Sequence, residues 1–328
     1  MEKLIKNGFV NKSVDKSLDL VREIEKLKKE KNAIILGHFY QLPEIQDISD
    51  FIGDSLALSQ QAAATKADII VFAGVHFMAE TAKLLCPDKK VIIPDLMAGC
   101  SLADSCPADE FKKFKDNYPD HVVISYINTT NEIKALSDII CTSSNAVQIV
   151  NSVPKDKKII FAPDKNLGDY INKLTGRNMV VWPGACHVHK RFSVERILQL
   201  KKDHPSALII AHPECERDVL ILADHIGSTS SLLKFTKDNK AKTFIIATET
   251  GILHQMQKAN PDKVFIPAPP DDATCACNDC SFMKLITLEK VYNSLKFEIP
   301  EVFVTDDMRE KALRPVLRML EISEKLGL

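Results

Sequence analysis

Three cysteines within six residues form the first chemical signal in the sequence. They stand in Asp271-Asp-Ala-Thr-Cys275-Ala-Cys277-Asn-Asp-Cys280, after the apolar run Lys263-Val-Phe-Ile-Pro267. Thiolates at this spacing favour a metal site, but a zinc ribbon needs a second cysteine pair, and a bacterial ferredoxin needs three closely spaced cysteines and a remote one. The remaining ligands must therefore come from elsewhere in the chain.

Two other segments share this pattern of an apolar run, a proline and a cysteine. They are Val91-Ile-Ile-Pro94 with Cys100 and Val180-Val-Trp-Pro183 with Cys186. Three thiolates plus an open position suit a four-iron four-sulfur cluster with one iron free to act as a Lewis acid, or zinc with three cysteines and a water. Four more cysteines are expected to be small buried apolar side chains: Cys86, Cys106, Cys141 and Cys215.

A threefold internal repeat connects these segments. Ser49-Asp-Phe-Ile-Gly-Asp-Ser55, Ser137-Asp-Ile-Ile-Cys-Thr-Ser143 and Ala223-Asp-His-Ile-Gly-Ser-Thr229 align without gaps. In each copy, a polar residue lies 17 positions before the last residue of this motif, at the end of an apolar run. A second polar residue follows two positions after the first. The pairs are His38 and Tyr40, Tyr126 and Asn128, and His212 and Glu214. The repeat predicts one α/β unit written three times.

The elements that must position these residues are short apolar runs, separated by helical patterns. This alternation is typical of parallel sheets covered on both faces. The predicted fold is α/β, with three similar domains that hold small parallel sheets in αβα layers, arranged with pseudo-threefold symmetry around a central active site. The three predicted units are 1–100, 101–186 and 187–280. The C-terminal helices of 281–328 are predicted to pack back on the first unit. A helix is predicted over Ser13 to Lys31.

The carboxyl ends of parallel strands are where ligands bind, so the repeated polar pairs are candidate site residues. Ser55, Ser143 and Thr229 each begin a helical pattern, so at least some of them are expected to be N-caps, and the starts of these helices could also bind an anion. His189 is a further candidate. Glu214 is the only carboxylate among the pairs, and burial beside His212 would suit it to proton transfer.

Composition excludes several classes of function. With 43 basic and 44 acidic residues, the net charge is -1, which gives no electrostatic basis for binding nucleic acid or an anionic membrane. No apolar run is long enough to span a membrane, and the N-terminus has no signal-peptide pattern. The expected location is the cytoplasm, where the nine cysteines would stay reduced.

Several motifs together resemble the quinolinate synthase family, and the match runs nearly end to end. They include Gly37-His-Phe-Tyr-Gln41, Gly74-Val-His-Phe-Met-Ala-Glu80, Ala98-Gly-Cys-Ser-Leu-Ala-Asp104, Trp182-Pro-Gly-Ala-Cys186 and His212-Pro-Glu-Cys215. The resemblance implies condensation of iminoaspartate with dihydroxyacetone phosphate to quinolinate, phosphate and water, in the biosynthesis of NAD. It also implies a four-iron four-sulfur (4Fe-4S) cluster with one iron not bound by cysteine.

The resemblance further implies roles for individual residues. The cluster ligands fall on Cys100, Cys186 and Cys280, and the last precedes a helical pattern from Ser281 whose dipole would favour a thiolate. Spacing alone leaves Cys275 and Cys277 as alternatives, and Cys277 could form a reversible disulfide with Cys280. The implied substrate contacts are His38, Tyr40, Ser55, Tyr126, Asn128, Ser143, His189, His212, Glu214 and Thr229. The expected catalytic residues among them are Glu214, Tyr40, Tyr126, His38 and His189.

Three other functions compete with this one. A hydro-lyase acting on a hydroxy acid would use the same open-iron cluster, whereas an iron–sulfur redox sensor would not need polar groups at all three strand ends. A radical enzyme using S-adenosylmethionine is disfavoured, because the sequence has no Cys-x3-Cys-x2-Cys run. Iminoaspartate is unstable, so a transient hand-over from an aspartate-oxidising enzyme is a possible partnership.

Overall fold

The structure, a computed structural model, describes residues 4–272 and 278–328. The chain divides into two compact units. One comprises Met1–Cys100 and Ser281–Leu313, and the other comprises Ser101–Cys280 and Arg314–Leu328. The last helix, α15 (Asp306–Lys325), contributes to both. The three-domain division predicted from the repeat stays a prediction.

The first unit holds one four-stranded parallel sheet in the order β4-β3-β5-β6. The strands are β3 (Ala33–His38), β4 (Phe51–Gly53), β5 (Ile69–Ala73) and β6 (Lys90–Ile92). Between them run α2 (Pro43–Ile48), α3 (Ser55–Ala64) and α4 (His76–Leu85). Also in this unit are α1 (Leu20–Glu30), α14 (Leu288–Phe297), the turn η3 (Met283–Leu285), and the hairpin of β1 (Ile5–Lys6) and β2 (Phe9–Val10). Helices α3 and α4 pack together, as do α1 and α14.

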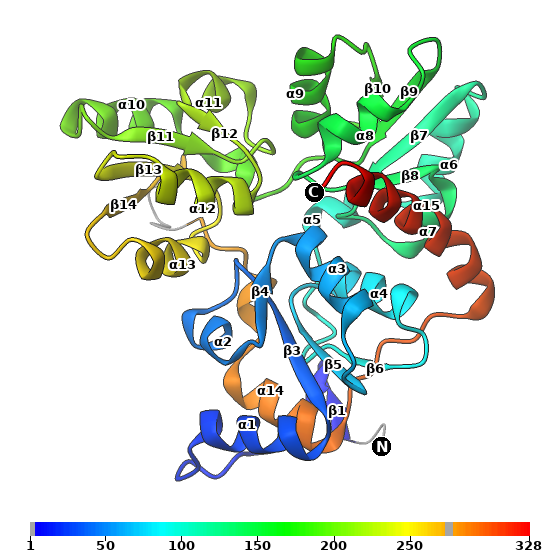
Figure 1. Ribbon diagram of the computed structural model, residues 1–328, viewed down its shortest axis with the longest axis vertical. Helices are drawn as coiled ribbons and strands as arrows, with labels where there is room; N and C mark the ends of the chain where they lie inside the picture. The colour runs from blue at the N-terminus through cyan, green and yellow to red at the C-terminus, as the bar shows by residue number, and fades with distance from the viewer. Residues whose placement is uncertain (1–3, 273–277) are drawn as a thin grey trace. The chain divides into compact units, whose positions relative to one another are not determined.

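The second unit holds two more parallel sheets, in the orders β10-β9-β7-β8 and β12-β11-β13-β14. The strands of one are β7 (His121–Tyr126), β8 (Ile139–Cys141), β9 (Lys158–Ala162) and β10 (Val180–Val181). Those of the other are β11 (Leu208–Ala211), β12 (His225–Ile226), β13 (Thr243–Ala247) and β14 (Val264–Pro267). Figure 1 shows each of these sheets with its own helices.

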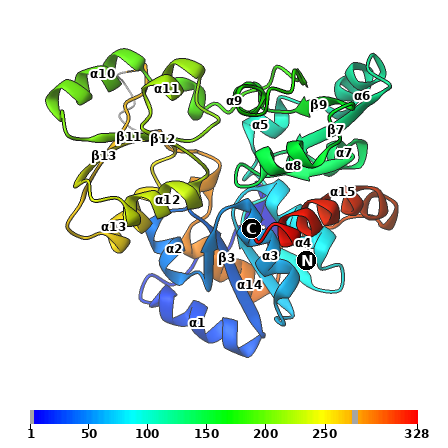
Figure 2. The same ribbon diagram turned by 45° about the horizontal axis from the view of Figure 1, so that its top comes forward.

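The helices of the second unit follow the same plan. Those before and around the β7 sheet are α5 (Ser101–Asp104), α6 (Ala108–Asp116), α7 (Asn131–Leu136), α8 (Ala146–Ser152) and α9 (Lys165–Thr175). Those of the β11 sheet are η2 (His189–Arg191), α10 (Val194–Asp203), α11 (Arg217–Leu222), α12 (Thr229–Asp238) and α13 (Ile252–Ala259). Figure 2 shows α10 and α11 on one side of the β11 sheet, and α12 and α13 on the other.

All three sheets have the same topology, which confirms the predicted α/β fold with three similar layered sheets. In each, the first strand lies between the second and the third, and the fourth is at the edge. The first strand pairs with a residue 15 positions later in every copy: Leu36 with Phe51, Ile124 with Ile139, and Ile210 with His225. The second strands are the part that sequence patterns missed, because two or three residues are too short to show a period.

The aspartate of each repeat motif locks this pairing. Asp50 Oδ2 accepts the Ile35 N–H at 2.7 Å, and Asp138 and Asp224 accept the Val123 and Ile209 N–H groups at 2.8 Å. The backbone N–H of each aspartate returns a bond to the carbonyl of the same strand residue, at 2.7–2.9 Å. The recurrence of these aspartates is therefore explained by strand pairing rather than by ligand binding.

We expect Asp138→Ala to lower the free energy of unfolding by about 1.5–3 kcal/mol, the usual value of a hydrogen bond to a charged group. Urea denaturation followed by circular dichroism measures this change. Asp138→Asn keeps an acceptor oxygen and serves as the matched control. Equal losses in the two variants would show that the hydrogen bond to Val123 is not what stabilises the sheet.

The N-terminal helix is shorter than predicted. Helix α1 begins at Leu20, where Asp19 caps it by accepting the Arg22 N–H at 3.1 Å, so the expected start near Ser13 is wrong. The apolar residues Leu18 and Val21 are 38% and 46% exposed, whereas Ile24 is fully buried. Among the described residues, no helix combines the length and apolar character that a membrane crossing requires.

Candidate active site

The first unit brings two of the predicted site residues together at the end of β3. The rings of His38 and Tyr40 meet edge to face, with centroids 4.6 Å apart, and both side chains are buried. The Tyr40 N–H donates to His38 Nδ1 at 3.1 Å, so this nitrogen is an acceptor. Lys284 Nζ donates to the Tyr40 carbonyl at 2.7 Å, which ties the segment after Cys280 to this strand end.

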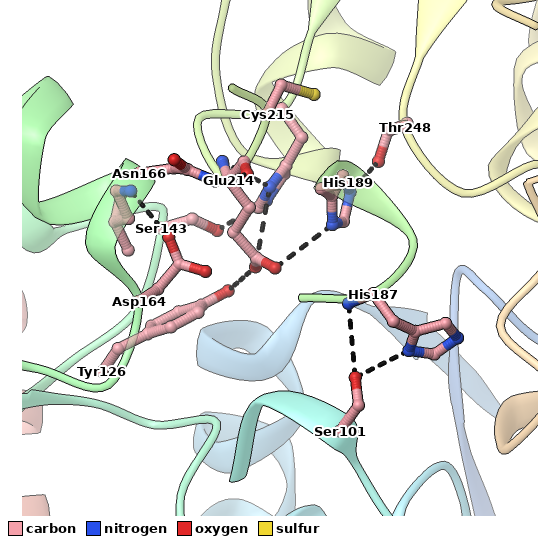
Figure 3. A network of polar contacts seen from close by, with 12 residues as sticks. Ser101, Tyr126, Ser143, Asp164, Asn166, His187, His189, Glu214, Cys215 and Thr248 are labelled. Carbon is pink, nitrogen blue, oxygen red and sulfur yellow. Dashed lines mark hydrogen bonds and ion pairs between the residues drawn. The ribbon is translucent and has the colours of Figure 1, made fainter. Parts of the chain in front are cut away.

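The second unit gathers a larger polar network around Glu214, a carboxylate that is only 3% exposed. The Tyr126 hydroxyl, at the end of β7, donates to Glu214 Oε1 at 2.6 Å. His189 Nδ1 lies 3.1 Å from Oε2, and His212 Nδ1 lies 3.6 Å from Oε1. Figure 3 shows Tyr126 and His189 pointing toward the Glu214 carboxylate from separate parts of the chain.

Burial alone would raise the pKa of Glu214, but its neighbours reverse the effect. Electrostatic interaction with His189 and His212, together with hydrogen bonds from His189 and Tyr126, lowers the pKa to about 2. Asp164 behaves in the opposite way, because burial and the charge of Glu214 raise its pKa well above the ordinary range. At neutral pH Glu214 is therefore ionised.

Second contacts fix both histidine rings. His189 Nε2 lies 2.9 Å from Thr248 Oγ1, and His212 Nε2 lies 3.2 Å from Ser143 Oγ. The two rings stack with centroids 4.8 Å apart and an angle of 28° between their planes. A ring held at both nitrogens has its orientation set before substrate binds.

The predicted N-caps are each displaced in the structure. Helix α3 is capped by Asp54, and α12 by Ser228, so Ser55 and Thr229 are first helical residues rather than caps. Ser143 precedes α8, whose N-cap position is held by Asn145. Capping therefore does not explain these three hydroxyl groups.

Burial separates the cysteines into two groups. Cys86, Cys106, Cys141 and Cys215 are buried, as predicted, and burial raises the pKa of each thiol, to about 12 for Cys106. Cys100, Cys186 and Cys280 are only partly buried. Cys275 and Cys277, and with them the predicted disulfide of Cys277 and Cys280, lie outside the described residues.

The loop of Cys186 is built to hold its shape. Trp182, at its start, donates from Nε1 to the Ser105 carbonyl at 2.9 Å and packs edge to face on Phe114. A Cβ at Gly184 would lie 2.5 Å from the Pro163 carbonyl oxygen, so only glycine fits. His187 Nδ1 lies 2.6 Å from Ser101 Oγ, which links the residue after Cys186 to the start of α5 (Figure 3).

Cys186, His189 and Glu214 offer ligand atoms within 4.8 Å of one another, so a metal could bind beside the Glu214 network.

The prediction of a helix that begins right after Cys280 is wrong, because only the short turn η3 at Met283–Leu285 precedes α14. The dipole argument for a Cys280 thiolate therefore fails.

Sequence reasoning missed Asp164, Asn166, Thr248 and Glu249. Asn166 Nδ2 donates to the Glu214 carbonyl at 3.0 Å. Asp164 and Glu249 are both fully buried and stand two residues after Ala162 and Ala247, the matched ends of β9 and β13. Their matched positions after β9 and β13 could have revealed Asp164 and Glu249 from the sequence.

Among the predicted site residues, Asn128 has no described contact with the Glu214 network. Its Oδ1 is buried without a hydrogen-bond partner in the described residues.

Comparison with known proteins shows the family to which the chain belongs. The family model described as Quinolinate synthetase A protein matches residues 22–321. The chain is 62% identical to the quinolinate synthase of Thermosynechococcus vestitus over 306 residues, which cover 93% of this chain and 96% of that one. It is 61% identical to the enzyme of Microcystis aeruginosa over 305 residues, covering 93% and 95%. The chain thus belongs to the quinolinate synthase family of enzymes.

Proposed function

We propose that this enzyme condenses iminoaspartate with dihydroxyacetone phosphate to give quinolinate, phosphate and water. The observation that carries the proposal is the ionised, buried Glu214, with Tyr126 on one carboxylate oxygen and His189 on the other, within reach of Cys186. Ring closure requires repeated proton transfers and loss of hydroxyl groups, and a carboxylate, a phenol and two imidazoles are groups that perform them.

We infer that the cofactor is a 4Fe-4S cluster held by Cys100, Cys186 and Cys280. The donor set fits, because these are the three described cysteines that are not buried, and the four buried thiols have raised pKa values that disfavour thiolates. A bound cluster with one iron not ligated by cysteine would supply a Lewis acid.

The protein's own groups divide the remaining tasks. Glu214 would remove a proton from bound substrate, and the Tyr126 hydroxyl would hold the carboxylate in place and stabilise its charge. His189 and His212, already fixed by Thr248 and Ser143, would orient substrate oxygens. Contacts to substrate are further assigned to His38, Tyr40, Ser55, Asn128, Ser143 and Thr229, and the main-chain N–H groups at the starts of α3 and α12 suit phosphate or carboxylates.

The proposed setting is the cytoplasm, where cysteines stay reduced and an aspartate-oxidising enzyme could hand over iminoaspartate. Such a supply is needed because the substrate is unstable.

Anaerobic purification with iron and sulfide analysis, followed by the condensation assay, tests the proposed function. We expect four irons and four sulfides per chain and quinolinate formation from the two substrates. Loss of water from a hydroxy acid without quinolinate formation would instead assign the same site to a hydro-lyase.

A further inference from the structure

Two buried carboxylates occupy matched positions in the second unit. Strands β9 and β13 end at Ala162 and Ala247, and Asp164 and Glu249 follow two residues later. Both are 0% exposed. A buried carboxylate is costly unless hydrogen bonds satisfy it, so what each one contacts shows what it does.

Glu249 uses both of its oxygens on backbone N–H groups. Oε1 accepts the Cys280 N–H at 3.0 Å, and Oε2 accepts the Gly251 N–H at 2.7 Å. Its neighbours hold nearby parts of the same region, since Thr250 Oγ1 donates to the Asp279 carboxylate and Thr248 contacts His189. Three consecutive residues therefore fix the end of the cysteine-rich loop and one histidine of the Glu214 network.

Asp164 lies beside the backbone of the Cys186 loop. Its Oδ1 accepts the Leu167 N–H at 2.7 Å, which caps α9, and the N–H groups of Asn166 and Cys186 face the same carboxylate. Oδ2 lies outside hydrogen-bonding geometry with any donor in the described residues. The Lys165 N–H also donates to the Gly184 carbonyl at 2.8 Å, which keeps the Cys186 loop beside the carboxylate.

Ordinary structural roles account for only part of these contacts. Capping α9 explains the bond to Leu167, and closing the turn after β13 explains the bond to Gly251. Neither explains why each carboxylate also faces the N–H of a cysteine assigned to the cluster. In the first unit the matched residue is Val75, whose side chain has no acceptor, and the loop before Cys100 is held by the His76 N–H, which donates to the Ala98 carbonyl at 2.7 Å.

We infer that Asp164 and Glu249 are positioning residues that set the orientation of Cys186 and Cys280 by attracting their backbone N–H groups. The inference rests on the proposed function, in which these two cysteines bind the cluster. Groups that orient metal ligands typically change metal affinity 10- to 100-fold when they are replaced.

The decisive measurement is the rate at which a chelator removes the cluster from anaerobically reconstituted protein. We expect Asp164→Ala and Glu249→Gln to lose the cluster at least about tenfold faster than the unmodified protein. Asp164→Asn should stay within about threefold of it, because the oxygen that accepts from Leu167 is retained and the amide nitrogen can replace Oδ2. Glu249→Gln has no such freedom, because both of its oxygens accept.

The matched controls are Asp138→Ala and Asp224→Ala, which remove a carboxylate that accepts a backbone N–H in the same two sheets, from Val123 and Ile209 rather than from a cysteine. They should lower stability and leave the rate of cluster loss near that of the unmodified protein. If Asp164→Ala and Glu249→Gln release the cluster no faster than these controls, the positioning role is wrong while the proposed function stands.

Hydrogen exchange of the cluster-free protein supplies a readout that needs no cofactor. Peptides containing the Cys186 and Cys280 amides should exchange faster in Asp164→Ala and Glu249→Gln, respectively, and not in the controls. Unchanged exchange at both cysteines would overturn the inference. If these amides exchange faster in the variants but the unmodified protein takes up no cluster, the result would count against the proposed function and not against the positioning role.

Discussion

Cys280→Ser is expected to abolish both the iron–sulfur cluster and quinolinate formation, whereas Cys275→Ser and Cys277→Ser should retain both. The reason is the position of Cys280, whose backbone N–H is fixed by the buried Glu249 carboxylate and whose following segment is tied to Tyr40 through Lys284. A ligand whose main chain is held before the metal arrives loses less conformational freedom on binding it.

The three variants should be purified without oxygen and compared by iron content, sulfide content and turnover. Cys86→Ser is a control for loss of a thiol, since Cys86 is buried and its thiol pKa is raised by burial. If Cys277→Ser lacks the cluster and Cys280→Ser retains it, the third ligand is Cys277 rather than Cys280.

Glu214→Gln is expected to lower turnover by about a hundredfold or more while leaving the cluster intact, the usual scale for a general acid or base. The amide keeps the size of the side chain and one acceptor oxygen for Tyr126, but it removes the negative charge that His189 and His212 stabilise. The measurement is steady-state quinolinate formation, with iron content and the cluster's visible absorption determined on the same samples.

Glu216→Gln provides the matched control for this change. Glu216 lies two residues after Glu214, and its side chain is about half exposed. Its Oε1 lies 3.5 Å from Lys165 Nζ, in an ion pair at the surface. An exposed pair of this kind contributes little, so the control should retain full turnover. Near-normal turnover in Glu214→Gln would remove Glu214 from the proton-transfer steps.

The sequence predicts most of the framework because the repeat carries its own register. The apolar runs around Ile35, Ile124 and Ile210 are long enough to show a buried strand, and the motif aspartates keep a constant distance from them. The short second strands could not be predicted, since a pair such as His225–Ile226 has no period of its own. The caps were displaced because Asp54 and Ser228, one position earlier, also have side chains that can cap.

The site was predicted less completely than the fold. His212 and Glu214 follow from the repeat, but the neighbours that keep the buried Glu214 ionised include Tyr126, which comes from a different sheet. Asp164 and Glu249 were missed because Val75 breaks the pattern in the first copy, so that only two of three copies carry a carboxylate. Side-chain chemistry that differs between copies gives no repeat signal.

The fixed spacing between the first two strands also determines where the chain can tolerate evolutionary change. In every copy the 15-residue interval is closed by backbone pairing and by an aspartate, so an insertion there would break both. The stretch from the proline after the fourth apolar run to the cysteine lacks this pairing, and its length differs among the copies, from Pro183–Cys186 to Pro267–Cys280. Natural insertions and deletions should therefore be tolerated better in these cysteine-containing loops than between the first two strands of a copy.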